Sequence, residues 1–219
     1  MFPADELHLG ARIRSLRTGR GVSLRALAAD LDISPSALSQ IERGKLRPSV
    51  TRLLQIMSAL DVSLSAAFGE TAPDATALAE TAPGPPTSDS GPGDAGTDGP
   101  DTDEPGRSEP VVVTRADEAA VLSLGDGVTY RSLTPVALSG TEVYETVYPP
   151  GSRSSQDAEY LRHTGHEMGS VTAGRLTVDV DGVPHELGPG DGIRFPSATP
   201  HRIRNDGDEP AVAVWINVH

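Results

Sequence analysis

The 219-residue sequence contains no cysteine. This absence excludes disulfide bonds and thiolate metal ligands, and it is compatible with a reducing compartment. The sequence also lacks an apolar run long enough to cross a bilayer, and its first ten residues, MFPADELHLG, are acidic where a secretory signal is basic and apolar. We therefore expect a cytoplasmic protein that has no membrane partner.

Basic residues are scarce as well, and they are unevenly distributed. The formal net charge is −13, which would argue against a nucleic-acid partner if the charge were spread evenly. Residues 1–69, however, carry a net charge of +3, whereas residues 70–108 and 109–219 each carry −8. Contact with phosphate groups is therefore expected from the first segment.

Residues 70–108 are rich in Pro, Gly, Ala, Ser, Thr and Asp and contain almost no large apolar side chain. Such a segment cannot fold by burying a core, so we predict a disordered acidic linker. A flexible chain of this length has a root-mean-square span of roughly 35 Å and would tether its two ends without orienting them. The predicted domains are therefore residues 7–69 and 109–219, one on each side of this linker.

The segment 31–47, LDISPSALSQIERGKLR, has the pattern of a turn followed by a short helix. Ser34 is a candidate N-cap, Pro35 suits the first helical position, and Gly44 is expected to end the helix. Upstream, Ser23 can cap another short helix whose leucines recur at three- and four-residue spacing. Two short helices around a tight turn predict a helix-turn-helix.

Residues 7–68 resemble the lambda-repressor-like (XRE) DNA-binding domain almost from end to end. The resemblance implies an all-α unit of five helices, in which the first runs from about Leu7 to Thr18, Ser49 caps the fourth, and the segment up to Phe68 closes the bundle. It also implies that Arg17 pairs with Glu42 of the recognition helix inside the domain.

In such domains the recognition helix enters the major groove with its N-terminus first. Ser36, Ser39 and Gln40 are then expected near base edges, and a glutamine can bind an adenine through two hydrogen bonds. The other predicted DNA-binding residues are Ser34 and the candidate phosphate contacts Ser23, Arg25, Arg43, Lys45 and Arg47.

The remaining domain is composed of short apolar and β-branched segments separated by Gly, Pro and Asp turns, which predicts an all-β sandwich or barrel. The predicted strands are residues 111–114, 128–133, 142–148, 169–174, 176–182, 192–196, 201–205 and 211–218. Within them, HTGHEMGSVTAG and GDGIRFPSATPHRIRN resemble the two cupin motifs. This resemblance implies the double-stranded β-helix, or jelly-roll barrel, of the cupins.

A metal site is predicted from the same two motifs. In an extended strand His163 and Glu167 share a face while His166 points away, and His201 would come from another strand. Two imidazoles and a carboxylate suit one divalent ion such as Fe(II), Mn(II), Ni(II) or Zn(II). Leu161 stands where cupins usually carry a further histidine, so the ion would have three protein ligands.

The alternative for the barrel is an organic ligand bound without metal, because cupin sensor domains often retain part of the metal motif while they bind such a ligand. Arg131, Tyr148 and Arg194 are candidate residues of the ligand pocket, together with Tyr130 and Trp215, although Tyr and Trp at such positions serve equally well as core residues.

Two classes of function follow. The first is a transcriptional regulator whose helix-turn-helix binds an operator in double-stranded DNA and whose cupin senses a small-molecule effector. The second is an iron oxygenase resembling hydroxypropylphosphonate epoxidase, in which His163, Glu167 and His201 would hold iron. The basic DNA-binding face favours the regulator over the enzyme.

A homodimer is expected, because one helix-turn-helix reads only half of a two-fold operator. Across a disordered tether, an effector is predicted to act through dimerisation, through docking of the DNA-binding domain on the cupin, or by releasing an acidic linker that masks the basic face.

Overall fold

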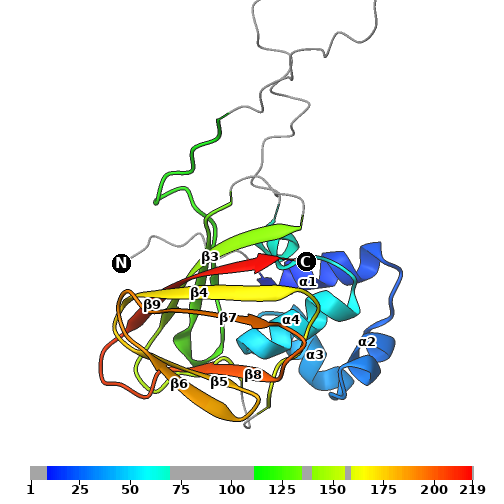
Figure 1. Ribbon diagram of the computed structural model, residues 1–219. Helices are drawn as coiled ribbons and strands as arrows, with labels where there is room; N and C mark the ends of the chain where they lie inside the picture. The colour runs from blue at the N-terminus through cyan, green and yellow to red at the C-terminus, as the bar shows by residue number, and fades with distance from the viewer. Residues whose placement is uncertain (1–8, 70–110, 135–139, 156–158, 219) are drawn as a thin grey trace, which may run out of the picture.

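The computed structural model describes residues 9–69, 111–134, 140–155 and 159–218, and the predicted linker lies outside these described residues. Figure 1 shows a helical unit packed beside a β-barrel. The N-terminal segment forms the helices and the C-terminal segment forms the strands, so the predicted all-α plus cupin-type all-β architecture is confirmed.

The helical unit contains four α-helices and one 3-10 helix. These are α1 (Leu9–Gly19), α2 (Leu24–Asp30), α3 (Pro35–Glu42), α4 (Val50–Ala59) and η1 (Leu64–Phe68). The predicted caps Ser23, Ser34 and Ser49 each accept a hydrogen bond of 3.1 Å from the backbone amide three residues further on, which satisfies a donor that the helix itself leaves free. The predicted fifth helix, which closes the bundle at Phe68, is the short 3-10 helix η1.

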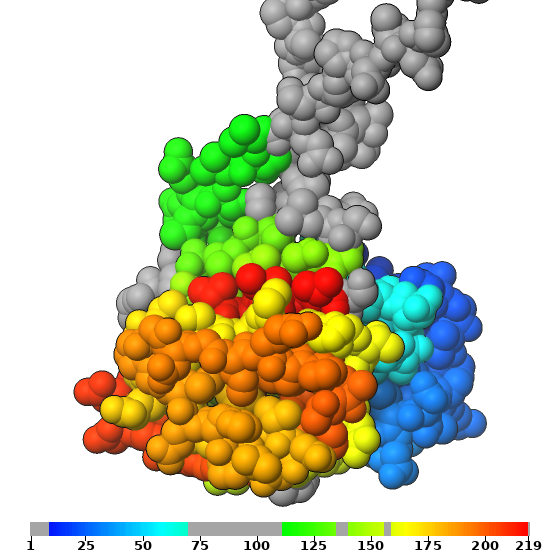
Figure 2. All heavy atoms as spheres, viewed as in Figure 1, coloured from blue at the N-terminus to red at the C-terminus, as the bar shows by residue number. Residues whose placement is uncertain are grey.

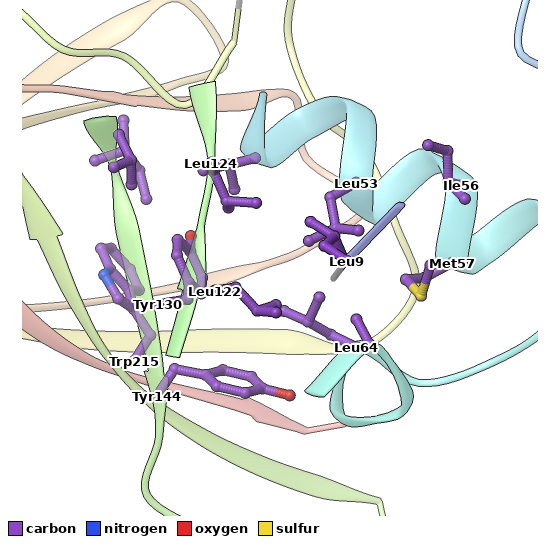
Figure 3. Packing of buried hydrophobic residues seen from close by; sticks show 14 of the residues in the cluster. Leu9, Leu53, Ile56, Met57, Leu64, Leu122, Leu124, Tyr130, Tyr144 and Trp215 are labelled. Atoms are coloured by element: carbon purple, nitrogen blue, oxygen red, sulfur yellow. The ribbon is translucent and has the colours of Figure 1, made fainter. Parts of the chain in front are cut away.

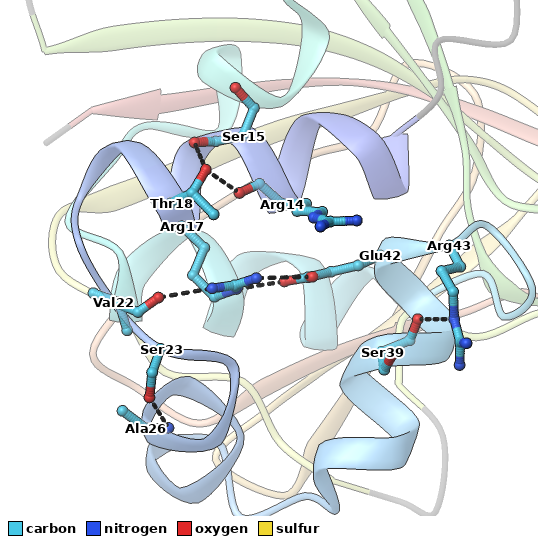
Figure 4. Close-up of polar contacts among 10 residues, drawn as sticks. All are labelled: Arg14, Ser15, Arg17, Thr18, Val22, Ser23, Ala26, Ser39, Glu42 and Arg43. Atoms are coloured by element: carbon cyan, nitrogen blue, oxygen red, sulfur yellow. Dashed lines mark hydrogen bonds and ion pairs between the residues drawn. The ribbon is translucent and has the colours of Figure 1, made fainter.

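Helices α1 and α3 are held together by a close approach and a buried ion pair. A side chain at Gly10 would overlap the carbonyl oxygen of Ile41, so only glycine allows this packing. Arg17 Nε donates to Glu42 Oε1 over 2.6 Å, and a second guanidinium nitrogen donates to Glu42 Oε2 over 3.0 Å (Figure 4). The pair implied by the resemblance is confirmed, and both side chains are buried.

The strands form two antiparallel sheets. The larger has the order β1 (Val121–Ser123), β2 (Thr129–Ser132), β3 (Thr141–Tyr148), β9 (Ala211–Val218), β4 (His166–Ala173) and β7 (Gly192–Pro196). The smaller has the order β6 (Val183–Leu187), β5 (Leu176–Val180) and β8 (His201–Arg204), and a short 3-10 turn, η3 (Gly125–Gly127), lies between β1 and β2.

The predicted strand at residues 111–114 is wrong. The backbone there belongs to no strand, and Val111 and Val113 are 93% and 60% exposed, so apolar composition alone did not place it in a sheet. The short strands β1 and β6 were missed, the latter because Pro184 and exposed polar residues interrupt its apolar pattern.

Alternation along β3 defines the inside of the barrel. Glu142, Tyr144, Thr146 and Tyr148 are buried, while the residues between them are half-buried on the outer face. Trp215 of β9 lies opposite Tyr144 and opposite Gly169 of β4, where any side chain would overlap the indole. The glycine therefore makes room for the largest side chain of the barrel interior.

The helical unit packs directly against the barrel (Figure 2). Buried leucines of α4 and η1 belong to the same hydrophobic cluster as Leu122, Tyr144 and Trp215 (Figure 3), and the rings of Phe68 and Tyr144 stack with centroids 5.5 Å apart. The expectation that the two domains are not mutually oriented is therefore wrong in this structure. The apolar face of α4 covers the barrel as well as its own bundle.

Candidate DNA-binding surface and metal site

The predicted DNA-binding residues lie at the start of α2, along α3 and in the loop that follows α3. All of them are exposed except Ser39, which is half-buried; the exposed ones are Ser23, Arg25, Ser34, Ser36, Gln40, Arg43, Lys45 and Arg47. The barrel is contacted mainly by α4 and η1. Docking on the barrel therefore leaves the polar side chains of α3 at the surface.

Backbone geometry on both sides of α3 sets its position. Asp32 adopts a left-handed conformation with φ 51°, a region that aspartate tolerates better than most residues, and it forms the turn between α2 and α3. At the other end, Gly44 has φ 66° and the amide of Lys45 donates to the Gln40 carbonyl over 2.8 Å, which satisfies the last turn of the helix.

One predicted phosphate contact is engaged within its own helix. Arg43 Nε donates to the backbone carbonyl of Ser39 over 3.0 Å (Figure 4). The side chain is nevertheless exposed, so it has to turn away from the helix before it can reach a phosphate.

The buried ion pair between Arg17 and Glu42 holds the helices that carry this surface in position. A third Arg17 nitrogen donates to the Val22 carbonyl over 2.7 Å, so one guanidinium joins α1, the residue before the α2 cap, and Glu42 of α3. The hydrogen bond to Glu42 raises the pKa of Arg17 although burial opposes it. The charged guanidinium and its three hydrogen bonds fix the relative position of the helices.

The structure brings together the three predicted metal ligands. Glu167 of β4 lies between two imidazoles: its Oε1 is 2.6 Å from His163 Nε2 and 3.0 Å from His201 Nε2. His163 comes from the loop before β4, and His201 begins β8. Their ligand atoms all lie within 4.8 Å of one another, so the three residues could hold a metal ion, whereas His166 is exposed as predicted.

Backbone contacts orient both imidazoles for this role. The Nδ1 atoms of His163 and His201 face the carbonyls of Thr164 and Thr199 at 3.0 and 2.8 Å. Because a carbonyl only accepts, each Nδ1 carries the hydrogen and each Nε2 is directed at Glu167, as in metal-binding histidines whose other nitrogen donates to the protein.

The charges within this cluster are strongly coupled. Burial opposes ionisation of Glu167, but its close contacts with the imidazoles of His163 and His201 outweigh it and lower the pKa of Glu167 to about 2. Burial likewise opposes protonation of His163, yet the contact with Glu167 raises its pKa above the ordinary value. A carboxylate that remains ionised between two imidazoles is a donor set that fits a divalent cation.

The cluster faces a cavity of about 20 Å³ between the barrel and the helical unit. Leu161, at the position of the fourth cupin ligand, is buried and lines this cavity, and its backbone pairs with His201. Three buried polar atoms that line it have no hydrogen-bond partner among the residues that the structure describes: Tyr144 Oη, Trp215 Nε1 and Asn217 Oδ1. The lining of the cavity therefore combines apolar side chains with hydrogen-bonding groups that are not in use.

The predicted ligand-pocket residues need correction. Arg131 pairs with Glu145 over 2.8 Å on the outer face of the sheet, and Arg194 is exposed, so neither lines the cavity. Tyr148 is buried inside the barrel with its hydroxyl 3.4 Å from that of Tyr130, and it is Tyr130 that lines the cavity.

Other cavity residues were missed, namely Tyr144, Asn217, Leu54 and Leu64. Strand parity with Tyr148 could have identified Tyr144, because residues four apart on a strand share a face. No local signal marked the two leucines, since they come from the helical unit.

Comparisons with known proteins cover both parts of the chain. A family described as Helix-turn-helix matches residues 13–66, and a family described as Cupin domain matches residues 144–217. Among the residues that the structure describes, no helix is long and apolar enough to cross a membrane.

Two relatives span nearly the whole chain. The HTH-type transcriptional regulator PuuR of Escherichia coli K12 is 25% identical over 90% of this chain and 86% of its own length. The crystal structure of an HTH_3 family transcriptional regulator from Vibrio cholerae is 25% identical, covers 98% of this chain and 96% of its own, and superposes with a TM-score of 0.61. Protein SchB of Streptomyces halstedii is 39% identical over 38% of this chain and 59% of its own length.

Proposed function

We infer that this protein regulates transcription by binding an operator and by sensing a small molecule. The chain is an XRE-type helix-turn-helix protein with a C-terminal cupin domain, and it is homologous to transcriptional regulators. The observation that carries the inference is the capped helix α3, whose polar side chains stay at the surface while α4 and η1 pack against the barrel. The partner is double-stranded DNA, which places the protein in the cytoplasm.

Base recognition is assigned to Ser36, Ser39 and Gln40, with Gln40 able to bind an adenine bidentately. Exposed basic side chains around α3 neutralise phosphates and set the register of the helix on the duplex. The candidates are Arg25, Arg43, Lys45 and Arg47, and the hydroxyls of Ser23 and Ser34 stand at the N-termini of α2 and α3, where phosphate contacts are favourable.

In the cupin we propose that His163, Glu167 and His201 hold one divalent ion, Fe, Mn, Ni or Zn. The convergent Nε2 and carboxylate atoms and the fixed tautomers support this. Such an ion with only three protein ligands offers open positions at which a small molecule can bind.

The cupin is proposed to sense rather than to catalyse. Relatives that span the chain are regulators, and the cavity at the three ligands is only about 20 Å³ when the helical unit is docked. The iron-oxygenase alternative requires substrate-anchoring basic residues, and the two candidate arginines, Arg131 and Arg194, lie outside the cavity.

We further propose a homodimer, because two helix-turn-helix units are needed for a two-fold operator. A row of half-buried apolar side chains on the outer face of β3 and β9 offers a surface for it: Val143, Val147, Val212, Val214 and Ile216. A second copy covering this row would bring two helical units into one assembly.

The test is DNA binding and metal content measured on the same preparations. Fluorescence anisotropy with the DNA upstream of the protein's own gene should show sequence-specific, salt-sensitive binding, and Gln40→Ala should weaken it about tenfold, in keeping with the loss of one bidentate contact. The His163→Ala, His201→Ala double variant should lose the metal, whereas His185→Ala, which removes an exposed histidine of β6, should keep it. Metal that persists in the double variant would exclude the proposed ligands.

A further inference from the structure

The barrel supplies helix caps that the helical unit lacks. The amide of Thr51, in the first turn of α4, donates to the Ser154 carbonyl of the barrel over 2.8 Å. Ser63 precedes η1 but makes no side-chain cap, and the amide of Ser65 donates instead to Glu142 Oε1 of β3 over 2.8 Å. Amide groups in the first turn of a helix need a partner, so docking satisfies two donors at once.

Other polar contacts surround these caps. The amide of Gly125 in η3 donates to the Pro48 carbonyl over 2.8 Å, and Arg52 of α4 lies 3.7 Å from the Glu159 carboxylate. The helical unit is therefore held to the barrel by specific hydrogen bonds as well as by the shared apolar cluster.

The docked helices also close the barrel over the candidate metal site. Leu54 and Leu64 line the small cavity together with Glu167 and His201. Wider clefts of about 610 and 440 Å³ adjoin α4, and Leu54 and His163 line both of them. Leu54 thus lines both wide clefts and also the small cavity inside the barrel.

The volumes decide what can bind. A cavity of about 20 Å³ accepts an ion or a water molecule. Pockets for organic ligands measure about 300–1,000 Å³. Tyr144 and Trp215 line only this small cavity, so an organic ligand cannot reach them until the leucines withdraw, whereas Asn217 also lines the cleft of about 610 Å³.

We propose that α4 and η1 act as a displaceable plug, so that an organic effector enters the barrel only by releasing the DNA-binding unit. The metal ion binds beneath the plug in either state. In the docked state the barrel fixes the orientation of α3. After release, the covalent connection between the two units is the segment 70–110. The consequence for operator binding rests on the proposed function, but the docking equilibrium does not.

Spin-label distances test the docking. The chain holds no cysteine, so Ser15→Cys in α1 and His185→Cys in β6, both exposed positions, can be labelled specifically. Doubly labelled chains diluted in unlabelled protein report distances within one chain. We expect one narrow distribution for the parent, and a broader, longer one for Leu54→Glu and Glu142→Ala.

The matched control is Glu145→Ala, because Glu145 lies on the same strand as Glu142 but pairs with Arg131 on the outer face. It should leave the distribution unchanged, and Glu142→Gln, which keeps an acceptor oxygen, should shift it less than Glu142→Ala. A broad distance distribution in the parent protein overturns the plug. So does a distance distribution in Leu54→Glu that equals that of the parent, provided that circular dichroism shows retained helical content.

A reversible lock tests the exclusion of ligands. Arg52→Cys and Glu159→Cys, bridged by a short bis-methanethiosulfonate reagent, hold the docked state until a reductant is added. The probe is the dye 8-anilinonaphthalene-1-sulfonate, which should bind Leu54→Glu at least tenfold more tightly than the bridged protein, while Ni²⁺ binds both. Equal dye affinity in the two overturns the proposal. If the parent protein fails to bind an operator but the spin-label distances are as expected, the proposed function is contradicted and the plug is not.

Discussion

At the scale of single residues, the buried contact between Arg17 and Glu42 shows how a charged pair can serve the recognition helix without touching DNA. Its two hydrogen bonds and the third to the Val22 carbonyl use the planar guanidinium as a fixed joint between helices. Lysine could not make the same three hydrogen bonds, because its single ammonium nitrogen cannot donate from separate nitrogens in a planar group to Glu42 and to the Val22 carbonyl.

Removal of Arg17 should therefore destabilise the helical unit strongly. Arg17→Ala leaves Glu42 buried without its partner, which costs roughly 3–5 kcal/mol of unfolding free energy. Urea unfolding followed by circular dichroism measures the loss. The control is Arg20→Ala, which breaks an exposed ion pair with Asp61 and should change the midpoint little. Similar losses in the two variants would contradict a structural role for the buried pair.

Sequence motifs predicted the proximity of three side chains, whereas metal binding by them stays a prediction. His163, Glu167 and His201 were identified from two sequence motifs, and the structure places their ligand atoms together. Arg131 and Arg194 were misplaced, because the face on which a strand residue points depends on register, and a shift of one residue reverses it.

At the scale of elements, helix ends were more predictable than strands. Serine caps are local signals, and the three predicted serines cap their helices. Strand membership depends on partners distant in sequence, so the exposed valines at 111–113 were misread and β6 was missed. At η1 even the cap came from another domain, through Glu142, and no local pattern could indicate it.

A pH dependence is predicted where β5 meets β8. Burial opposes ionisation of Asp179, but hydrogen bonds from Arg202 and Arg204 outweigh it and lower its pKa below the ordinary value. The ionised form therefore stabilises the fold above the pKa of the unfolded chain, about 4, and this stabilisation is lost as the pH falls through the folded-state value.

Asp179→Asn should lower the urea midpoint at pH 7 and flatten its decline as the pH falls below the ordinary aspartate pKa of about 4. Asp181→Asn is the matched control, because Asp181 is exposed in the adjoining hairpin and asparagine tolerates its positive φ of 51°. Parallel midpoint curves for Asp179→Asn and the parent would show that the arginine contacts contribute no pH-dependent stability.

At the scale of the whole molecule, composition indicated two units and an acidic connection but not their contact. The apolar residues of α4 satisfy the helical pattern equally well inside a bundle or against a second domain, so sequence alone could not reveal that they cover the barrel. Docking fixes α3 relative to the barrel, and a dimer of barrels would then set the separation of the two recognition helices.

The most direct test of the regulator is selection of binding sites from random double-stranded DNA by the full chain, followed by titration of the selected sequence. We expect a two-fold symmetric motif with half-sites about one helical turn apart, ~34 Å, and weaker binding when five base pairs are inserted between them. Recovery of no sequence, with binding that depends on salt but not on base order, would contradict the claim that this protein reads an operator.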